Sequence, residues 1–441
     1  MKKILSGIIL AGASCAVFAT DARVETMGRN SNFFRDEIQI HQNPANLGLH
    51  GNIMYGSYGG FNEGLRRPEF PYFGGVVSFG EQGSSRFSIG ATFNRVDSAL
   101  NVIAGNLDSL GLRTTVPSQT NNGRPLVFAG NSWNWPSQTV TNTELDWLGK
   151  VDLMTAYTLS GGATIGLGAY FAFQNGQRRD LVTGMESMDR SAKELQNRFV
   201  RGSIGVNTPI GDGTDLEASV GISALTLRGA APGNDPTFFY AADNDIGVQL
   251  GVRFFSDMAS INGALVPSLN FSLFNYGKDD KIADVSAGIG LNVNIDRGFF
   301  WTGFEGVYNR TTNIVVGSNR VENDQNVPFT AGGNYNDIIF GRRELMGGRV
   351  GFGIERNVLT DWFVIRVGGG KLLARERVDS ETSKWVETPD EDHVSLGMGV
   401  NVENRLKIDF TVSENLPYTF TNLFSGHASH IVTRVSAVFL F

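Results

Sequence analysis

The sequence has few residues that cross-link a chain or interrupt its strands. It contains one cysteine in 441 residues, Cys15, which excludes an intramolecular disulfide and a structural metal site built from several thiolates. Thirteen prolines accompany 55 glycines and 31 phenylalanines, a balance that favours a glycine- and aromatic-rich β-protein. After the amino terminus, no run reaches the roughly 18 uninterrupted apolar residues that a membrane-spanning helix needs.

Basic residues are also in the minority. The chain has 37 Lys and Arg against 44 Asp and Glu, a net charge of −7. Removing Lys2 and Lys3, which belong to the leader described next, lowers the net charge to about −9. Nucleic acid attracts basic surfaces, so no nucleic-acid partner is expected.

The amino terminus has the pattern of a secretory leader. Lys2 and Lys3 precede an apolar run, and small residues lie near Ala19. This pattern predicts a signal peptide at residues 1–19, cleaved after Ala19. Gly12 lies where a lipoprotein signal would require leucine, so Cys15 is not expected to carry a lipid.

From Gly51 to the carboxy terminus, apolar residues alternate with small or polar ones. The clearest examples are residues 284–295, 393–402 and 430–441. About ten residues with this period of two are enough for a tilted strand to cross a membrane. The last strand ends in Phe439 and Phe441, and this ending resembles the insertion signal of bacterial outer-membrane β-barrels. The resemblance implies the barrel-assembly machinery as a partner.

The lengths of the connections indicate the architecture. Roughly seven short polar turns alternate with roughly eight long connections, and a soluble sandwich has no reason to sort its turns in this way. We predict an all-β fold, a transmembrane antiparallel up-and-down β-barrel of about 16 strands, with 14 as the alternative. The barrel comprises residues 51–441. Because a barrel in lipid leaves no open edge, the strand beginning near Asn52 should pair with residues 430–441.

The second face of the alternating strands carries side chains of both charges. A barrel of this size encloses water, and rings of charged side chains can tune its ion preference. We expect this face to line the lumen, where the charges either pair with one another or form a specific site. The candidate lumen-lining residues are Lys150, Asp152, Arg201, Glu217, Asp245, Arg253, Asp284, Arg349, Glu355, Arg366, Lys407, Asp409 and Arg434.

Two segments are long enough to occupy the lumen. Residues 20–50 precede the first strand, and the charges at residues 35–37 could pair with Arg349 and Glu355. Residues 96–146 form the longest connection and are rich in leucine, so a polar lumen wall would offer them little hydrophobic gain. We therefore expect residues 20–50 to plug the lower lumen and residues 96–146 to cover the outer mouth.

The aromatic residues and the alternation along individual strands predict which way particular side chains point. Trp301 and Tyr308 bracket one strand, which predicts a membrane-interface girdle, with a buried aromatic core as the alternative.

The alternation also predicts the cost of substitutions at single positions. An arginine that replaces Leu396 should destabilise the barrel by ~2–4 kcal/mol near mid-membrane, whereas an arginine that replaces Ser395, on the other face, should cost almost nothing. We expect Ile289, Leu291, Val394 and Leu396 to face lipid, and Asp284, Asn292, His393 and Asn401 to face the lumen.

Signals for chemistry are weak. His393 and Ser395 share a face, but a hydrolase also needs a hydrogen-bonded base and oxyanion donors. The five histidines show no metal-ligand spacing. We therefore expect no enzyme activity, no catalytic residue, no metal and no cofactor.

The segment Asn43-Pro44-Ala45-Asn46-Leu47, just before the first strand, resembles the long-chain fatty-acid transporter superfamily and the related barrels of gliding-type secretion systems. The resemblance implies an amino-terminal plug in the lumen. It also implies fewer strands than the connections indicate.

Three functions remain open for a protein placed in the bacterial outer membrane in contact with lipid. The first is a passive, porin-like channel for small solutes. The second is a transporter of hydrophobic compounds, favoured by the apolar residues 96–146. The third is a structural, adhesive or secretion-accessory barrel, favoured if the lumen is blocked. The sequence fixes neither the solute nor the oligomeric state.

Overall fold

The computed structural model describes residues 21–59, 71–81, 84–97, 127–129, 132–134, 149–176, 195–230, 238–275, 281–318, 338–358, 361–378, 385–387, 391–403, 405–412 and 432–441. The predicted signal peptide and most of residues 96–146 lie outside these ranges. In the described part of the chain, no helix is long and apolar enough to cross a membrane.

Among the described residues, three short helices precede the strands, and a fourth lies between β10 and β11. The helices are α2 (Asp21–Thr26), η1 (Glu37–His41), η2 (Pro44–Leu49) and η3 (Ala259–Ile261). The strands are β1 (Ile53–Gly59), β2 (Tyr72–Phe79), β3 (Arg86–Phe93), β4 (Val127–Ala129), β5 (Ser132–Asn134), β6 (Gly149–Thr158), β7 (Thr164–Gly176), β8 (Leu195–Gly211), β9 (Thr214–Ala230), β10 (Phe238–Met258), β11 (Gly263–Asn275), β12 (Lys281–Ile295), β13 (Gly298–Ser318), β14 (Ile338–Asn357), β15 (Phe363–Val378), β16 (Val386–Glu387), β17 (Glu391–Val402), β18 (Leu406–Val412) and β19 (Val432–Leu440).

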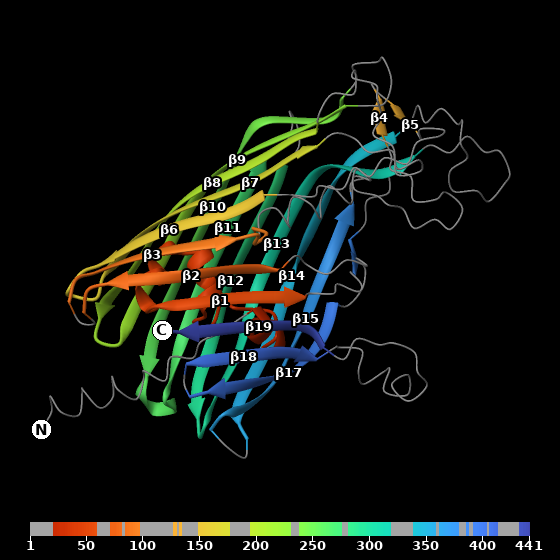
Figure 1. Ribbon diagram of the computed structural model, residues 1–441. Helices are drawn as coiled ribbons and strands as arrows, with labels where there is room; N and C mark the ends of the chain where they lie inside the picture. Colours follow the sequence, from red (N-terminus) through yellow and green to blue (C-terminus); the bar gives the residue numbers. More distant parts are fainter. Residues whose placement is uncertain are drawn as a thin grey trace, which may run out of the picture.

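The strands form one closed antiparallel barrel (Figure 1). Within the described residues the wall has 16 strands, since β16 only extends the edge of β15 and β4–β5 form a separate hairpin. The barrel closes where β1 pairs with β19, with Ile53 opposite Leu440 and Gly59 opposite Arg434. The predicted all-β barrel, its strand number and its closure are confirmed. The smaller number implied by the family resemblance is wrong.

The wall differs in height around the barrel. Strands β10 and β13 have 21 residues each, whereas β1 and β18, beside the closure, have 7. Figure 1 shows the long strands β10 and β13 extending past the short strands β1 and β18 at one end of the barrel. The short turns gather at the opposite end, as the interleaved connections predict.

The outer surface of the wall is apolar. Ile246, Ile289 and Val394 expose 56%, 49% and 63% of their area, and a transmembrane barrel turns such residues toward lipid. Trp301 departs from the expectation of an interface girdle. It is 0% exposed and points inward, where its indole N–H donates to the carbonyl oxygen of Met27 at 2.9 Å.

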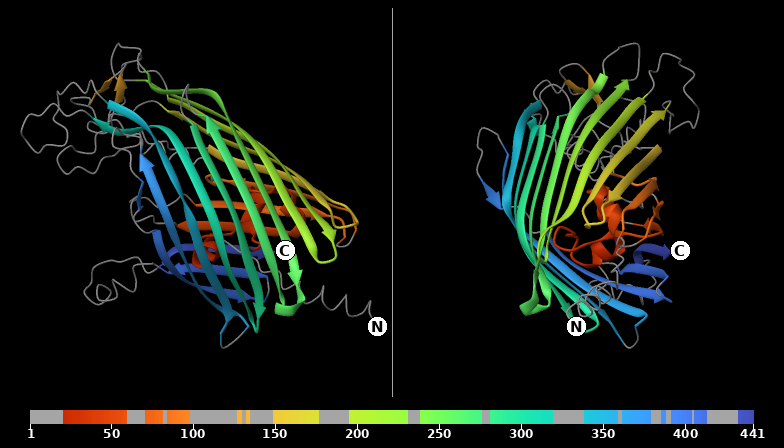
Figure 2. Two further views of the ribbon diagram at one scale, coloured as in Figure 1. Left: turned by 180° about the vertical axis from the view of Figure 1, so that it is seen from behind. Right: turned by 90° about the vertical axis from the view of Figure 1, so that its left-hand side faces the viewer.

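Residues 21–50 lie inside the barrel. Helix α2 packs against β15, β17, β18 and β19, and η2 packs against β3, β6, β7 and β8. Figure 2 shows this segment enclosed by the wall, in the half nearer the short turns. The core of the molecule is therefore the boundary between this segment and the inner face of the barrel.

Candidate functional site

Local hydrogen bonds shape the enclosed segment. The Asp36 carboxylate accepts from the Ile38 amide at 3.1 Å, and the Gln39 side chain accepts from the Asp36 amide, which completes a capping box for η1. Asn43 caps η2 by accepting from the Ala45 amide, and Pro44 occupies the first turn. These residues turn the chain twice within the lumen before it enters β1.

The first ion-pair network joins α2 to the barrel wall. Arg23 donates to Glu355 of β14 at 2.7 Å and lies 3.6 Å from Asp36. Glu355 also accepts from Arg366 of β15, which donates to Asp409 of β18 at 2.6 Å. Arg23 is 1% exposed. Buried charges are stabilised when they are paired and hydrogen-bonded, and Glu355 and Asp409 both accept hydrogen bonds from Arg366 across three strands.

A second network holds the middle of the segment. Arg35 donates to Glu217 and Asp215 of β9, each at 2.8 Å. Glu217 also bonds to Arg253 of β10, which donates to the Gln39 side chain at 2.9 Å. The expected pairing of Arg35 with Glu355 is therefore wrong, because Arg23 occupies that carboxylate.

A third network lies beside His41. Arg95 forms two hydrogen bonds of 2.9 Å with Asp152 of β6, and it lies 3.2 Å from Asp97. Arg201 of β8 lies 2.9 Å from Asp97 and donates to the His41 carbonyl oxygen at 2.8 Å. The third network therefore contacts the enclosed segment through the His41 carbonyl oxygen, whereas the first two pair charges of the segment with charges of the wall.

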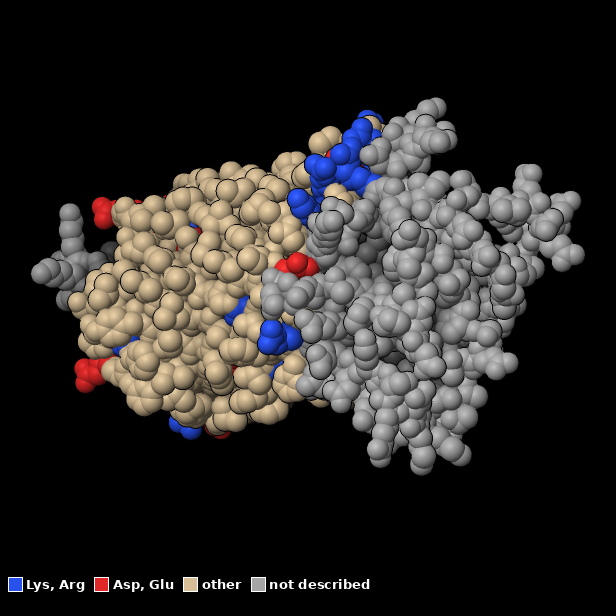
Figure 3. All heavy atoms as spheres, turned by 90° about the horizontal axis from the view of Figure 1, so that it is seen from above, with Lys and Arg blue, Asp and Glu red and all other residues tan. Residues whose placement is uncertain are grey.

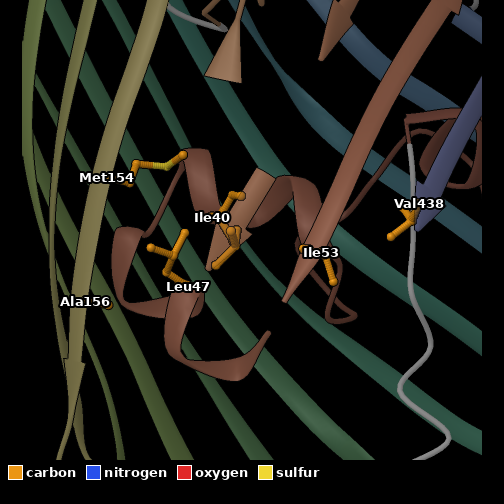
Figure 4. Packing of buried hydrophobic residues seen from close by; sticks show 7 residues of the cluster. Ile40, Leu47, Ile53, Met154, Ala156 and Val438 are labelled. Atoms are coloured by element: carbon orange, nitrogen blue, oxygen red, sulfur yellow. The ribbon is translucent and has the colours of Figure 1, made fainter. Parts of the chain in front are cut away.

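Apolar contacts join the same surfaces. Phe33 and Phe34 pack against Trp301 with ring centroids 5.9 Å and 5.7 Å apart. A second cluster contains Ile40 and Leu47 from the segment and wall residues from β1, β2, β6 and β19, and Figure 4 shows most of its side chains. The Arg23 guanidinium lies 5.3 Å from the Phe34 ring centroid, so apolar surface and charge are buried together there.

Glycines on the inner wall make room for this packing. A Cβ at Gly166 would lie 2.3 Å from the Ala45 nitrogen, and one at Gly290 would lie 2.4 Å from the Phe33 ring. A Cβ at Gly368 would lie 2.4 Å from the Gly28 nitrogen. A larger side chain at these places would displace the segment. Their glycines therefore have a packing role as well as a conformational one.

A polar cavity lies between the enclosed segment and the inner faces of β8 to β12. Its volume is about 270 Å³, and Arg201, Gln249, Arg253 and Asp284 are among its lining residues. Asn32 and Asn43 of the enclosed segment form part of its lining. Within the described residues, no group of three or more His, Cys, Asp or Glu side chains is arranged to hold a metal ion.

Two other sequence-predicted lumen residues, Arg349 and Arg434, also lie beside the enclosed segment. Arg349 lies 3.3 Å from Glu305, which accepts from Asn32 at 2.8 Å. Arg434 lies 3.4 Å from Asp21 and 3.2 Å from Glu25. Lys150 is buried, and Asp245 and Lys407 are half-buried.

Sequence reasoning missed Arg23, Arg95, Asp97 and Glu305. Arg23 and Arg95 lie outside the strands, where no alternation shows which way a side chain points. Glu305 lies on a strand and could have been found from the period of two, because it shares the inner face with Trp301.

Burial changes the acid–base behaviour of the enclosed segment. It raises the pKa of Asp36 to about 7, although Arg23 acts in the opposite direction. Burial also raises the pKa of Glu37 well above its usual value. The pKa of His41 is held well below its usual value by burial and by Arg95 and Arg201. The segment therefore binds and loses protons differently inside the barrel than in water.

Neither a family model nor a curated relative matches the sequence. Among solved structures, the chain is similar to the P. putida toluene transporter TodX at 11% identity and a TM-score of 0.38, covering 95% of this chain and 97% of that one. It is similar to the Ralstonia pickettii toluene transporter TbuX at 11% identity and a TM-score of 0.30, covering 95% and 96%. It is similar to BamA from Haemophilus ducreyi lacking POTRA domains 1–3 at 8% identity and a TM-score of 0.36, covering 88% and 69%. Similarity at this level does not identify the solute.

Proposed function

We propose that this protein is a channel for small polar solutes in the bacterial outer membrane, and that residues 21–50 close it in this conformation. In this proposal residues 1–19 direct export and residues 51–441 form the channel wall. The closed barrel and its apolar outer surface support the membrane location. The enclosed segment and its buried ion pairs support a closed state.

The polar cavity beside Arg201 and Arg253 is the observation that carries this proposal. Gln249 and Asp284 add further polar groups to its lining. A small polar solute can replace its water contacts with these groups, whereas an apolar compound would desolvate them without compensation. The cavity therefore favours polar solutes over the hydrophobic compounds of the second hypothesis.

Liposome swelling tests this function. Vesicles containing the full chain should swell slowly in an isotonic solution of a small neutral sugar. Vesicles containing a variant that lacks residues 24–42 should swell several-fold faster, because the barrier to water and sugar is removed. Equal rates from correctly folded proteins would overturn the proposal. If neither vesicle swells, the structural or secretion-accessory function becomes the better one.

The second hypothesis can be tested with the same protein. Toluene binding to the full chain, measured by calorimetry, should be absent if the cavity selects polar solutes. Saturable binding of toluene with one site per barrel would favour transport of hydrophobic compounds instead.

A further inference from the structure

Arginines gather on the outer surface of the barrel, at the end of β13–β15 that lies away from the short turns. They are Arg310 of β13, Arg342 of β14, and Arg375 and Arg377 of β15. The strand register places Arg310 directly opposite Glu344, and Glu344 directly opposite Arg377. Figure 3 shows Lys and Arg atoms gathered where the described surface meets the grey atoms. We call these four arginines the rim cluster.

The alternation of exposed residues shows that the rim cluster faces outward. On β14, Met346 exposes 54% of its area and Val350 exposes 41%. Arg342 is an even number of residues away from both, so it lies on the same face of the strand. On β15, Leu373 exposes 57%, and Arg375 and Arg377 share its parity.

Strand β13 gives the same result. Phe304 exposes 53% of its area, and Arg310 lies on the same face. Arg343, by contrast, has the opposite parity and donates to Glu376 at 2.7 Å, on the inner side of the same two strands.

The rim cluster lies about one hydrocarbon thickness from the short-turn end. Between Arg356 and Glu344, the outward residues of β14 are Ile354, Phe352, Val350, Gly348 and Met346, none of which is charged. At ~3.3 Å per residue this stretch spans ~40 Å, and a strand tilt of ~40–45° reduces its height to ~30 Å. An apolar band of this height ends at the level of the lipid headgroups.

Positive charge exceeds negative charge among the described side chains here. Glu344 lies 2.6 Å from Arg377, 3.3 Å from Arg342 and 3.9 Å from Arg310. One carboxylate therefore faces three guanidinium groups, each with five donor hydrogens. The side chains of Arg310, Arg342 and Arg377 remain 44%, 31% and 31% exposed, so a further anion can reach them.

We propose that the rim cluster binds the phosphate groups of an anionic lipid in the outer leaflet of the membrane. Guanidinium groups bind phosphate with two parallel hydrogen bonds, and a lipid supplies phosphate at this height. Trp385, whose ring centroid lies 5.3 Å from Arg377, adds an amphipathic side chain typical of that level. The inference rests on the proposed membrane location but requires no conduction.

Lipid retention tests this inference. The full chain is placed in phosphatidylcholine nanodiscs containing diphosphorylated lipid A or its dephosphorylated form, and bound lipid is measured by native mass spectrometry. The full chain should retain the phosphorylated form. The triple variant Arg310→Gln, Arg342→Gln, Arg377→Gln should bind it about 100-fold more weakly, or about fivefold per arginine.

A pair of neighbouring residues supplies the control. Arg342→Gln should weaken binding about fivefold, whereas Arg343→Gln should change it less than twofold, because Arg343 faces inward. This comparison remains valid if the triple variant fails to fold. Equal binding by both single variants, equal retention of the two lipids, or complete displacement by millimolar inorganic phosphate would overturn the proposal. Because conductance is not measured, a failure of the channel function leaves this result interpretable.

Discussion

Arg23 and Glu355 form a hydrogen-bonded ion pair at 2.7 Å although 332 residues separate them in the chain. Arg23 belongs to the first described helix, and Glu355 belongs to β14, which pairs with β13, the strand that carries Trp301. Because Glu355 also accepts from Arg366, the pair ties α2 to two neighbouring strands, β14 and β15.

The first prediction concerns this pair. Arg23→Met leaves Glu355 with Arg366 alone and should lower the free energy of opening of the segment by about 3 kcal/mol. Hydrogen exchange at residues 21–27 measures the change. Arg29→Met is the control, because Arg29 is 48% exposed and lies 3.7 Å from Glu25, an arrangement that contributes less than about 1 kcal/mol. Equal effects of the two substitutions would contradict a role for the buried pair.

The second prediction concerns close packing. Gly166→Ala places a Cβ against the Pro44–Ala45 peptide and should displace η2, which speeds hydrogen exchange there at least tenfold. Gly202→Ala should leave exchange unchanged, since nothing lies within 4 Å of a Cβ at that position. If both variants exchange like the natural protein, the glycines do not seat the segment.

The third prediction concerns pH. The raised pKa of Asp36, about 7, means that the enclosed segment holds a proton that the opened segment loses above pH 3.8. The stabilisation is complete below that pH and is lost as pH rises through 7. Asp36→Asn keeps the acceptor for the Ile38 amide but does not titrate.

Exchange at residues 36–43 should therefore be similar in the two proteins below pH 3.8, where Asp36 is protonated in both the enclosed and the opened segment. At pH 8 it should be faster in the natural protein than in Asp36→Asn. His41 and the other titrating groups are present in both proteins, so the difference isolates Asp36. A constant ratio of the two exchange rates from pH 5 to pH 8 would contradict the raised pKa.

The fourth prediction concerns the two faces of the wall. Ile289→Arg places a charge on the outer surface and should cost ~2–4 kcal/mol near mid-membrane. Ser286→Arg, at the cavity on the opposite face of the same strand, should cost much less. Urea titration in lipid vesicles measures both, and equal costs would mean that the assigned faces are wrong.

The expectation that arginine at Ser395 costs almost nothing must be corrected. Ser395 is 0% exposed and donates to the Gly368 carbonyl oxygen at 3.3 Å. Gly368 packs against Gly28, so an arginine at Ser395 would collide with the enclosed segment. A lumen-facing position tolerates a large side chain only where the lumen is empty.

The barrel could be predicted from sequence because it depends on a local pattern, the alternation of residues along each strand. A period of two and the interleaved connections determine strand number and closure, as the pairing of Ile53 with Leu440 shows. The burial of Trp301 could not be predicted in this way. Trp301 lies on the inner face according to the period of two. A tryptophan near a strand end is equally typical of an interface girdle, so the residue type alone did not show that Trp301 contacts the enclosed segment.

Local sequence patterns also could not predict which wall residues the enclosed segment contacts. Arg35 and Arg23 are both near carboxylates in space, and only the path of the chain decides that Arg35 meets Glu217 while Arg23 meets Glu355. Residues 21–50 have no long periodic element, because α2, η1 and η2 have six, five and six residues. Their arrangement is set by tertiary contacts.

Single-channel conductance in a planar bilayer tests the central claim most directly. The full chain should remain closed, and a variant lacking residues 24–42 should conduct in large steps, because the ion-paired segment no longer fills the lumen. A variant lacking residues 104–134 should remain as closed as the full chain. Large steps from the second deletion and none from the first would contradict closure by residues 21–50.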